Sequence, residues 1–166
     1  MSTTADPLIF IVDENEVFAS MVYGFLKTHH YKNAKVFTSV EDAITKAKEK
    51  PDIIICENLY NNLSGIDFMR RFRNTSLNST FIFLSSFENI EAVVNVMREG
   101  AFDYIVKGRN SLNKLNKTLQ RFNSNIKNTQ LNKHMSHALY FVFLAILALT
   151  CIILLLAYLF PTTFRL

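Results

Sequence analysis

Short apolar runs alternate with longer amphipathic segments through most of the chain. A run of about four to eight apolar residues bounded by polar or turn residues is typical of a strand buried on both faces. Such runs occupy residues 8–12, 53–56 and 81–84, and shorter strands are predicted over 34–37 and 104–106. Because helical segments separate them, the pattern predicts an α/β fold with five parallel strands in a doubly wound sheet and helices on both faces.

Three of the intervening segments repeat apolar residues every three or four positions, as helices with one buried face do. The repeated positions are Val17, Phe18, Met21, Val22 and Phe25; Ile90, Val93, Val94 and Met97; and Leu112, Leu115, Leu119, Phe122 and Ile126. Two more helices are predicted, one over 66–73 and one that Ser39 caps and that runs to about Lys48, with Asp42 as its capping-box acid.

Residues 138–160 differ from everything before them, because none of these 23 residues is charged. At roughly 1.5 Å per residue, a helix of this length spans the ~30 Å hydrocarbon core of a bilayer. A buried core helix is the alternative, but such a helix is rarely apolar on every face over this length. The stretch therefore predicts a single transmembrane helix, followed by a short extracytoplasmic tail at 161–166.

Charge is distributed unevenly along the chain. All fourteen acidic residues lie at or before Asp103, together with ten Lys and Arg, whereas eight Lys and Arg and no acid follow from Tyr104 onward. Lys127 and Lys133 precede the apolar stretch and only Arg165 follows it, which predicts a cytoplasmic N-terminal domain held at the inner membrane. The chain does not open on a charged segment followed by an apolar run, so no signal peptide is expected.

Polar side chains follow the predicted strands at their carboxyl ends. Right-handed crossovers bring these ends to one edge of a parallel sheet, where ligands of open α/β sheets bind. The side chains expected there are Asp13, Glu14, Glu57, Ser85 and Lys107. Three carboxylates, a hydroxyl and an ammonium suit a hard divalent cation and a phosphoryl group. The structural alternative is that Lys107 only neutralises crowded carboxylates.

These segments resemble the receiver domain of two-component response regulators, over about residues 6–126. The matching stretches are Phe10-Ile-Val-Asp-Glu14, Pro51-Asp52 with Glu57, Ser64-Gly65, Leu84-Ser85-Ser86 and Gly100-Ala-Phe-Asp-Tyr-Ile-Val-Lys107. The resemblance implies a flavodoxin-like fold that accepts a phosphoryl group from a histidine kinase. It also implies that Asp13 and Glu14 help to hold Mg²⁺, that Ser85 and Lys107 contact the phosphoryl group, and that Tyr104 rotates inward on switching.

The chain departs from this family at the phosphoryl acceptor, where Glu57 stands in place of the usual Asp. The extra methylene carries the carboxylate roughly 1–1.5 Å further toward the metal site and Lys107. About 1 Å of misplacement can slow in-line transfer on the order of 10²-fold, so Glu57 is expected to be a poor acceptor and a weak Mg²⁺ ligand. Three interpretations follow: a standing partial mimic of the phosphorylated state, a working acceptor, or an inert relic paired with Lys107.

Two loop residues also depart from the family. Gly108 follows Lys107 where a cis proline is common, and a trans bond is expected because a non-proline cis bond costs about 2.5–4 kcal/mol. Asn61 replaces a proline in the loop after the acceptor, which loosens that loop. Both changes predict relaxed catalytic geometry.

Residues 127–137 join the predicted domain to the apolar stretch. They are basic, and they continue a segment in which Asn, a weak helix former, occurs at 110, 113, 116, 123, 125, 128 and 132. A polar linker or frayed helix is therefore expected. Basic side chains there favour anionic headgroups by roughly 1 kcal/mol each. The stripe over 112–126 is expected to pack on the sheet, although the same spacing also suits a dimer seam. No second folded domain supports a nucleic-acid role.

The sequence therefore predicts a membrane-anchored receiver-like signalling module of a two-component or phosphorelay system. It is not expected to be an enzyme. Its output would be contact with a histidine kinase or an output protein, through the face of the fourth helix, the last strand and the fifth helix. The alternatives are a phosphoacceptor with Mg²⁺-dependent transfer at Glu57, and an inert membrane adaptor.

The first prediction concerns topology. The basic residues before the apolar stretch should retain the N-terminal domain in the cytoplasm and place Leu166 outside it. A reporter fused after Leu166 should therefore be active only if it functions outside the cytoplasm. Paired alkaline phosphatase and fluorescent protein fusions measure this. A cytoplasmic signal at Leu166, or a chain that stays in solution after lysis without detergent, would contradict the predicted span.

Overall fold

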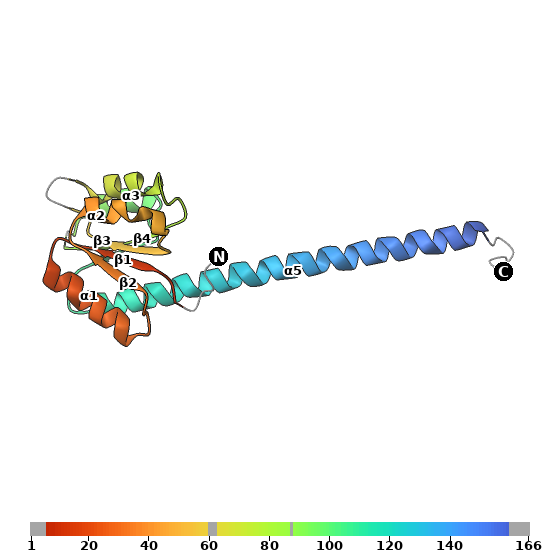
Figure 1. The fold of residues 1–166 in the computed structure, drawn as a ribbon, viewed down its shortest axis with the longest axis horizontal. Helices are drawn as coiled ribbons and strands as arrows, with labels where there is room; N and C mark the ends of the chain where they lie inside the picture. The colour runs from red at the N-terminus through yellow and green to blue at the C-terminus, as the bar shows by residue number, and fades with distance from the viewer. Residues whose placement is uncertain (1–5, 60–62, 87, 160–166) are drawn as a thin grey trace. The chain divides into compact units, whose positions relative to one another are not determined.

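The structure is a computed structural model that describes residues 6–59, 63–86 and 88–159, with side chains described to residue 125 and again over 140–155. The chain divides into two compact units, Met1–Phe122 and Asn123–Leu166. Figure 1 traces the strands and helices along the chain.

The first unit contains a five-stranded sheet in the order β2-β1-β3-β4-β5, with every pair parallel. The strands are β1 (Ile9–Val12), β2 (Ala34–Phe37), β3 (Ile53–Cys56), β4 (Thr80–Ser85) and β5 (Asp103–Val106). The helices are α1 (Glu16–Thr28), α2 (Val40–Thr45), α3 (Gly65–Arg73), α4 (Ile90–Arg98) and α5 (Ser111–Leu159), with a 3₁₀ turn over Ala47–Glu49. The predicted doubly wound sheet is confirmed.

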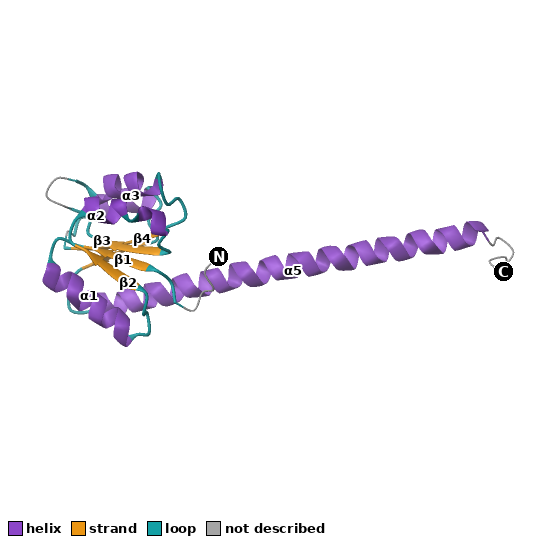
Figure 2. Ribbon diagram, viewed as in Figure 1, coloured by secondary structure: helices purple, strands orange, loops and turns teal. Residues whose placement is uncertain are grey.

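Helices lie on both faces of the sheet, with α2 and α3 on one side and α1 on the other (Figure 2). Because successive strand residues point to opposite faces, each strand contributes to two separate cores. The α2–α3 side is rich in aromatic rings, and Phe10, Phe68, Phe72 and Phe81 meet edge to face with centroids 5.7–6.3 Å apart. The other side is aliphatic, with buried Ile9, Ile11, Ile53, Ile55 and Ile82.

Polar side chains begin four of the helices. Asn15, Ser39, Ser64 and Asn89 each accept a hydrogen bond from the backbone N–H three residues on, which satisfies one of the free donors of the first turn. The predicted cap at Ser39 is confirmed, with its Oγ 3.1 Å from the Asp42 nitrogen. The α-helix that it begins ends at Thr45, earlier than predicted, and the 3₁₀ turn follows.

The predicted buried faces of α1 and α4 are wrong in part. In α1 the buried residues are Ala19, Val22 and Leu26, whereas Val17 is 81% exposed and Met21 46% exposed. In α4 only Val96 is buried; of the predicted stripe, Val93 is half-buried and Ile90, Val94 and Met97 are exposed. The rotation of a helix about its axis is set by its connections to the sheet, so small Ala19 can face the sheet while larger apolar residues stay in solvent.

The fifth helix continues from the first unit through the second. In the first unit it buries Leu115, Leu119 and Phe122, as predicted. Residues 127–137 are helical, so of the two alternatives expected for them, a polar linker or a frayed helix, the structure agrees with a helix. Among the residues that the structure describes, no helix has both the length and the apolar character that crossing a membrane requires.

Gly65 begins α3 where a side chain has no room. A Cβ at this position would lie 2.5 Å from Cε1 of Phe83 and 2.7 Å from the carbonyl oxygen of Glu57. The Gly65 N–H donates to the carbonyl of Asn58 at 2.7 Å, which closes the loop after β3. Glycine therefore allows the helix to start directly against the end of this strand.

Gly65→Ala should lower the free energy of unfolding by about 1–3 kcal/mol, because the added methyl group overpacks a contact with backbone. Urea unfolding of the purified chain in detergent measures the change. Gly24→Ala is the matched control: its Cβ would meet nothing within 4 Å, and replacing a helical glycine should stabilise the domain by up to about 1 kcal/mol. Equal stabilities for the two variants would contradict the close packing at Gly65.

Candidate functional site

Four of the predicted site residues lie at the same edge of the sheet. Asp13 follows β1, Glu57 follows β3, Ser85 ends β4 and Lys107 follows β5. These four strands are consecutive neighbours in the sheet, so their carboxyl ends lie side by side. The backbone N–H of Lys107 also donates to the Ser85 carbonyl at 2.7 Å, which fixes the end of β5 against β4.

Lys107 joins the two carboxylates of this edge. Its Nζ lies 2.6 Å from Oδ2 of Asp13 and 2.8 Å from Oε2 of Glu57. The three side chains are 14%, 9% and 11% exposed, so the ion pairs are largely shielded from solvent. The same Nζ lies 4.2 Å from the centroid of the Phe18 ring, within the range of a cation–π contact.

Both oxygens of Glu57 accept hydrogen bonds. Oε1 accepts the backbone N–H of Asn58 at 2.7 Å. Oε2 accepts the N–H of Ser86 at 3.0 Å and its hydroxyl at 3.3 Å, in addition to the ammonium of Lys107. Sequence reasoning missed the part played by Ser86 and Asn58, although both directly follow a predicted site residue.

The surroundings of Glu57 favour its charged form. Burial raises the pKa of this carboxyl, but hydrogen bonds from Lys107 and Ser85 and from the amides of Asn58 and Ser86 lower it, and the net pKa lies below 4.5. Burial lowers the pKa of Lys107, and its bonds to Asp13 and Glu57 raise it above the ordinary lysine value. The pair is therefore ionised at neutral pH.

Tyr104 lies against the same site. Its ring stacks on Phe83, with centroids 6.1 Å apart and planes 11° apart, and it packs on the aromatic core. Burial is the main reason that the pKa of its hydroxyl is raised; the charge of Glu57 adds to this, while hydrogen bonds with the side chains of Ser85 and Asn58 oppose it. The Tyr104 hydroxyl is thus hydrogen-bonded to Ser85, whose side chain also bonds Glu57.

The remaining predicted features are placed differently. Glu14 is exposed, and no cluster of three potential metal-ligating side chains occurs among the described residues. Of the three carboxylates expected to bind Mg²⁺, Asp13 and Glu57 meet at the Lys107 ammonium, whereas Glu14 is exposed. No cis peptide occurs in the described chain, so the bond before Gly108 is trans, as predicted. Asn61 lies outside the described residues.

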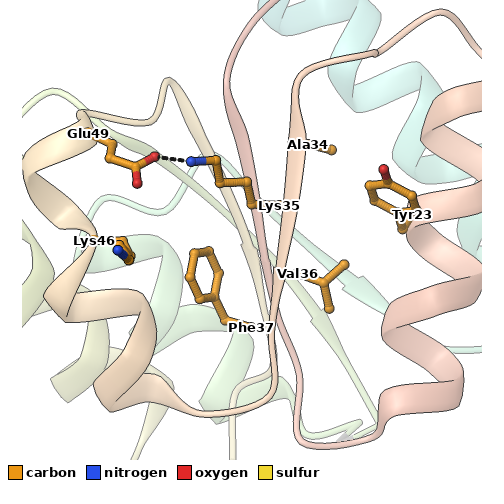
Figure 3. A pocket seen from close by; sticks show the side chains of 7 residues that line it. All are labelled: Tyr23, Ala34, Lys35, Val36, Phe37, Lys46 and Glu49. Carbon is orange, nitrogen blue, oxygen red and sulfur yellow. Dashed lines mark hydrogen bonds and ion pairs between the residues drawn. The ribbon is translucent and has the colours of Figure 1, made fainter.

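A pocket lies away from these strand ends, beside the edge strand β2 (Figure 3). It has a volume of about 470 Å³ and is lined by Tyr23, Ala34, Lys35, Val36, Phe37, Lys46 and Glu49. Lys35 is already paired with Glu49 at 2.5 Å. The pocket contains none of the carboxyl-edge side chains, so the candidate site remains the cluster around Lys107.

The fold and the site define a doubly wound α/β domain with acids and a lysine at the carboxyl edge of its sheet. Residues 9–120 match the family model of the response regulator receiver domain. The chain therefore belongs to the response regulator receiver family and carries a receiver domain of a two-component signalling system.

Curated relatives match the same region. Chemotaxis protein CheY of Thermotoga maritima is 28% identical over 100 residues, which cover 60% of this chain and 83% of that protein. Protein RcaC of Microchaete diplosiphon is 30% identical over 99 residues, and this chain spans only 15% of its length.

Solved structures share the fold. A response regulator receiver protein from Pseudomonas putida aligns with a TM-score of 0.64 at 25% identity, covering 70% of this chain and 98% of that one. A response regulator from Burkholderia pseudomallei aligns with a TM-score of 0.62 at 22% identity, covering 75% and 73%; that structure contains a phosphorylated aspartic acid, a calcium ion and citrate.

The arrangement around Lys107 does not fit a divalent cation without rearrangement. Mg²⁺ requires oxygen ligands at about 2.0–2.1 Å in an octahedral set. One oxygen each of Asp13 and Glu57 points to the Lys107 ammonium instead, and Glu14 is exposed. A cation between these carboxylates would have to displace Lys107. The weak Mg²⁺ binding expected from sequence stays a prediction.

The lowered pKa of Glu57 should make stability depend on pH. A carboxyl whose pKa is lower in the folded chain than in the unfolded one adds stability above the unfolded value, here about 4.5. That stability is lost as the pH falls through the folded value. Urea unfolding from pH 7 to pH 3 should therefore show a fall that is smaller in Glu57→Gln, which does not titrate.

Glu88→Gln removes an exposed acid outside the site and serves as the control, which should keep the wild-type pH dependence. A Glu57→Gln chain that loses as much stability on acidification as the wild type would contradict the assignment.

Proposed function

We propose that this chain is a membrane-anchored receiver-like module in which Glu57 takes the phosphoacceptor position and acts as a standing partial mimic of the phosphorylated state. The module is not an enzyme. It signals by contact with a protein partner, a histidine kinase or an output protein. The whole protein's partners and activity are part of this proposal.

The observation that carries the proposal is the set of donors on Glu57 Oε2. A backbone N–H, a hydroxyl and an ammonium, from Ser86 and Lys107, converge on this one oxygen. Such donors are the groups that bind phosphoryl oxygens in proteins. The longer side chain thus brings a carboxylate oxygen to donors that a phosphoryl oxygen could otherwise use. A carboxylate held in this way is a poor nucleophile, which argues against conventional transfer.

The position of Tyr104 supports the same interpretation. In the family an inward aromatic accompanies the switched state, and here Tyr104 stacks on Phe83 and contacts the core without any modification of the chain. Its hydrogen bond with Ser85, which also bonds Glu57, links the ring to the carboxylate. A change in the charge of Glu57 would therefore affect the conformation of Tyr104 through their shared hydrogen-bond partner, Ser85.

The surface of α4 supports output by protein contact. Ile90, Val94 and Met97 are spaced as one helical stripe and are all exposed. A contiguous apolar surface of this kind is typical of an interaction site. The stripe lies on the helix that precedes β5, the strand that carries Tyr104.

The apolar stretch 138–160 supports the membrane anchor. Its described side chains, Tyr140 to Leu155, are all exposed on the helix, as suits contact with lipid rather than a folded core. The Thr150 hydroxyl donates to the Leu147 carbonyl at 2.8 Å, so this polar group is satisfied within the helix. The stretch extends beyond the described side chains at both ends.

Phosphoryl labelling tests the acceptor. The full chain in detergent should take no stable label from acetyl phosphate, because Glu57 is displaced from the family's transfer geometry. Glu57→Asp should gain labelling by at least about tenfold, since the shorter side chain withdraws the carboxylate. Acid-quenched autoradiography measures both. Stable label on wild-type Glu57 would favour the working acceptor instead.

Partner recovery tests the mimic with a matched variant. Glu57→Gln keeps the side-chain length and removes the charge, so it should release Tyr104 and reduce recovery of the partner that crosslinks to the wild-type chain in membranes. Glu88→Gln removes a charge outside the site and should not. A partner that binds Glu57→Gln as well as the wild type would leave only an inert adaptor.

A further inference from the structure

We infer that Lys107 serves as an internal cation in place of a divalent metal, and that Phe18 is the positioning residue that holds it there. The inference deepens the proposed function, because it concerns regulation of the same site. The test measures Mg²⁺ affinity and the NMR signal of the Lys107 ammonium, neither of which requires a protein partner.

The ammonium of Lys107 lies where a metal would need to bind. It contacts Asp13 Oδ2 at 2.6 Å and Glu57 Oε2 at 2.8 Å, and these are the two buried carboxylates of the edge. A cation bound between the same oxygens would lie close to the ammonium and repel it. Two ion pairs that are largely shielded from water make the internal cation a strong competitor.

Phe18 covers a further side of the ammonium. Its ring centroid lies 4.2 Å from Nζ, close enough for the face of the ring to attract the positive charge. The ring replaces water on that side. Lys107 is thus held by two carboxylates and one aromatic ring, which come from the ends of β1 and β3 and from the first turn of α1.

A chain of hydrogen bonds fixes Phe18 relative to the same carboxylate. Asp13 Oδ1 accepts the N–H of Asn15 at 2.9 Å, and Asn15 Oδ1 accepts the N–H of Phe18 at 3.0 Å. One oxygen of Asp13 therefore helps to set the start of α1 while the other binds Lys107. These bonds place the backbone of Phe18 beside the site, and from there its ring reaches the Lys107 ammonium.

The ring should therefore lower the affinity of the site for Mg²⁺. Removing it should loosen Lys107 and let the metal compete. A cation–π contact of the usual strength corresponds to a change of about three- to thirtyfold in Mg²⁺ affinity. Phe18→Leu keeps an apolar side chain, whereas Phe18→Tyr keeps the ring and should behave as the wild type.

The experiment is Mg²⁺ titration calorimetry on the full chain in lipid nanodiscs, with the ¹H–¹⁵N signal of the Lys107 ammonium as a second measurement. Phe18→Leu should bind Mg²⁺ about three- to thirtyfold more tightly than the wild type and Phe18→Tyr. Its Lys107 ammonium protons should also exchange faster with water. Lys107→Met, which removes the internal cation, should bind Mg²⁺ more tightly than the wild type.

Phe25→Leu is the matched control, because it removes another half-buried ring of α1 that stacks on His29 rather than on Lys107. It should match the wild type in both measurements. Wild-type Mg²⁺ affinity and ammonium exchange in Phe18→Leu would overturn the role of Phe18. A Lys107→Met chain that binds Mg²⁺ no better would overturn the internal cation. A partner insensitive to Glu57→Gln would instead remove the proposed signalling role and leave these results unchanged.

Discussion

The ion pairs of Lys107 with Asp13 and Glu57 are the interaction on which the site depends. They connect the ends of three strands that are far apart in the sequence, and they do so in a largely buried setting. Breaking one partner of such a group would leave charge buried without compensation, which is strongly destabilising. The order of the strands is what makes the contact available, because β1, β3, β4 and β5 are consecutive in the sheet.

The two cores of the sheet give this edge a rigid base. Phenylalanine rings packed edge to face fill one side and branched aliphatic residues fill the other, so each strand is held from both directions. At the edge itself, backbone groups surround Glu57. Gly65 allows α3 to start against this residue, and the backbone amides of Asn58 and Ser86 donate to the Glu57 carboxylate. Side-chain length at position 57 then decides which donors the carboxylate reaches.

The first prediction from periodicity, the doubly wound sheet, succeeded because buried strands leave unmistakable apolar runs such as Ile53–Cys56. The prediction of which face of α1 is buried was wrong in part, because Val17 and Met21 are as apolar as the residues that the helix buries. Ser86 was missed because its main contribution is a backbone N–H, which leaves no trace in residue type. The expected ligand set of Asp13, Glu14 and Glu57 came from their places after the strands together with the family resemblance, and it stays a prediction; residue type alone did not indicate that Glu14 is exposed while Asp13 and Glu57 are buried.

The sequence by itself determined the strands, their parallel order of connection and the residues at their carboxyl ends, because hydrophobic period and right-handed crossovers act locally or through general topology. It also determined the charge division and the uncharged stretch 138–160. Only the tertiary structure decided which donor meets which oxygen, that Phe18 covers Lys107 and that Tyr104 stacks on Phe83. Those contacts join residues distant in the chain, at separations of a few ångströms that no one-dimensional pattern records.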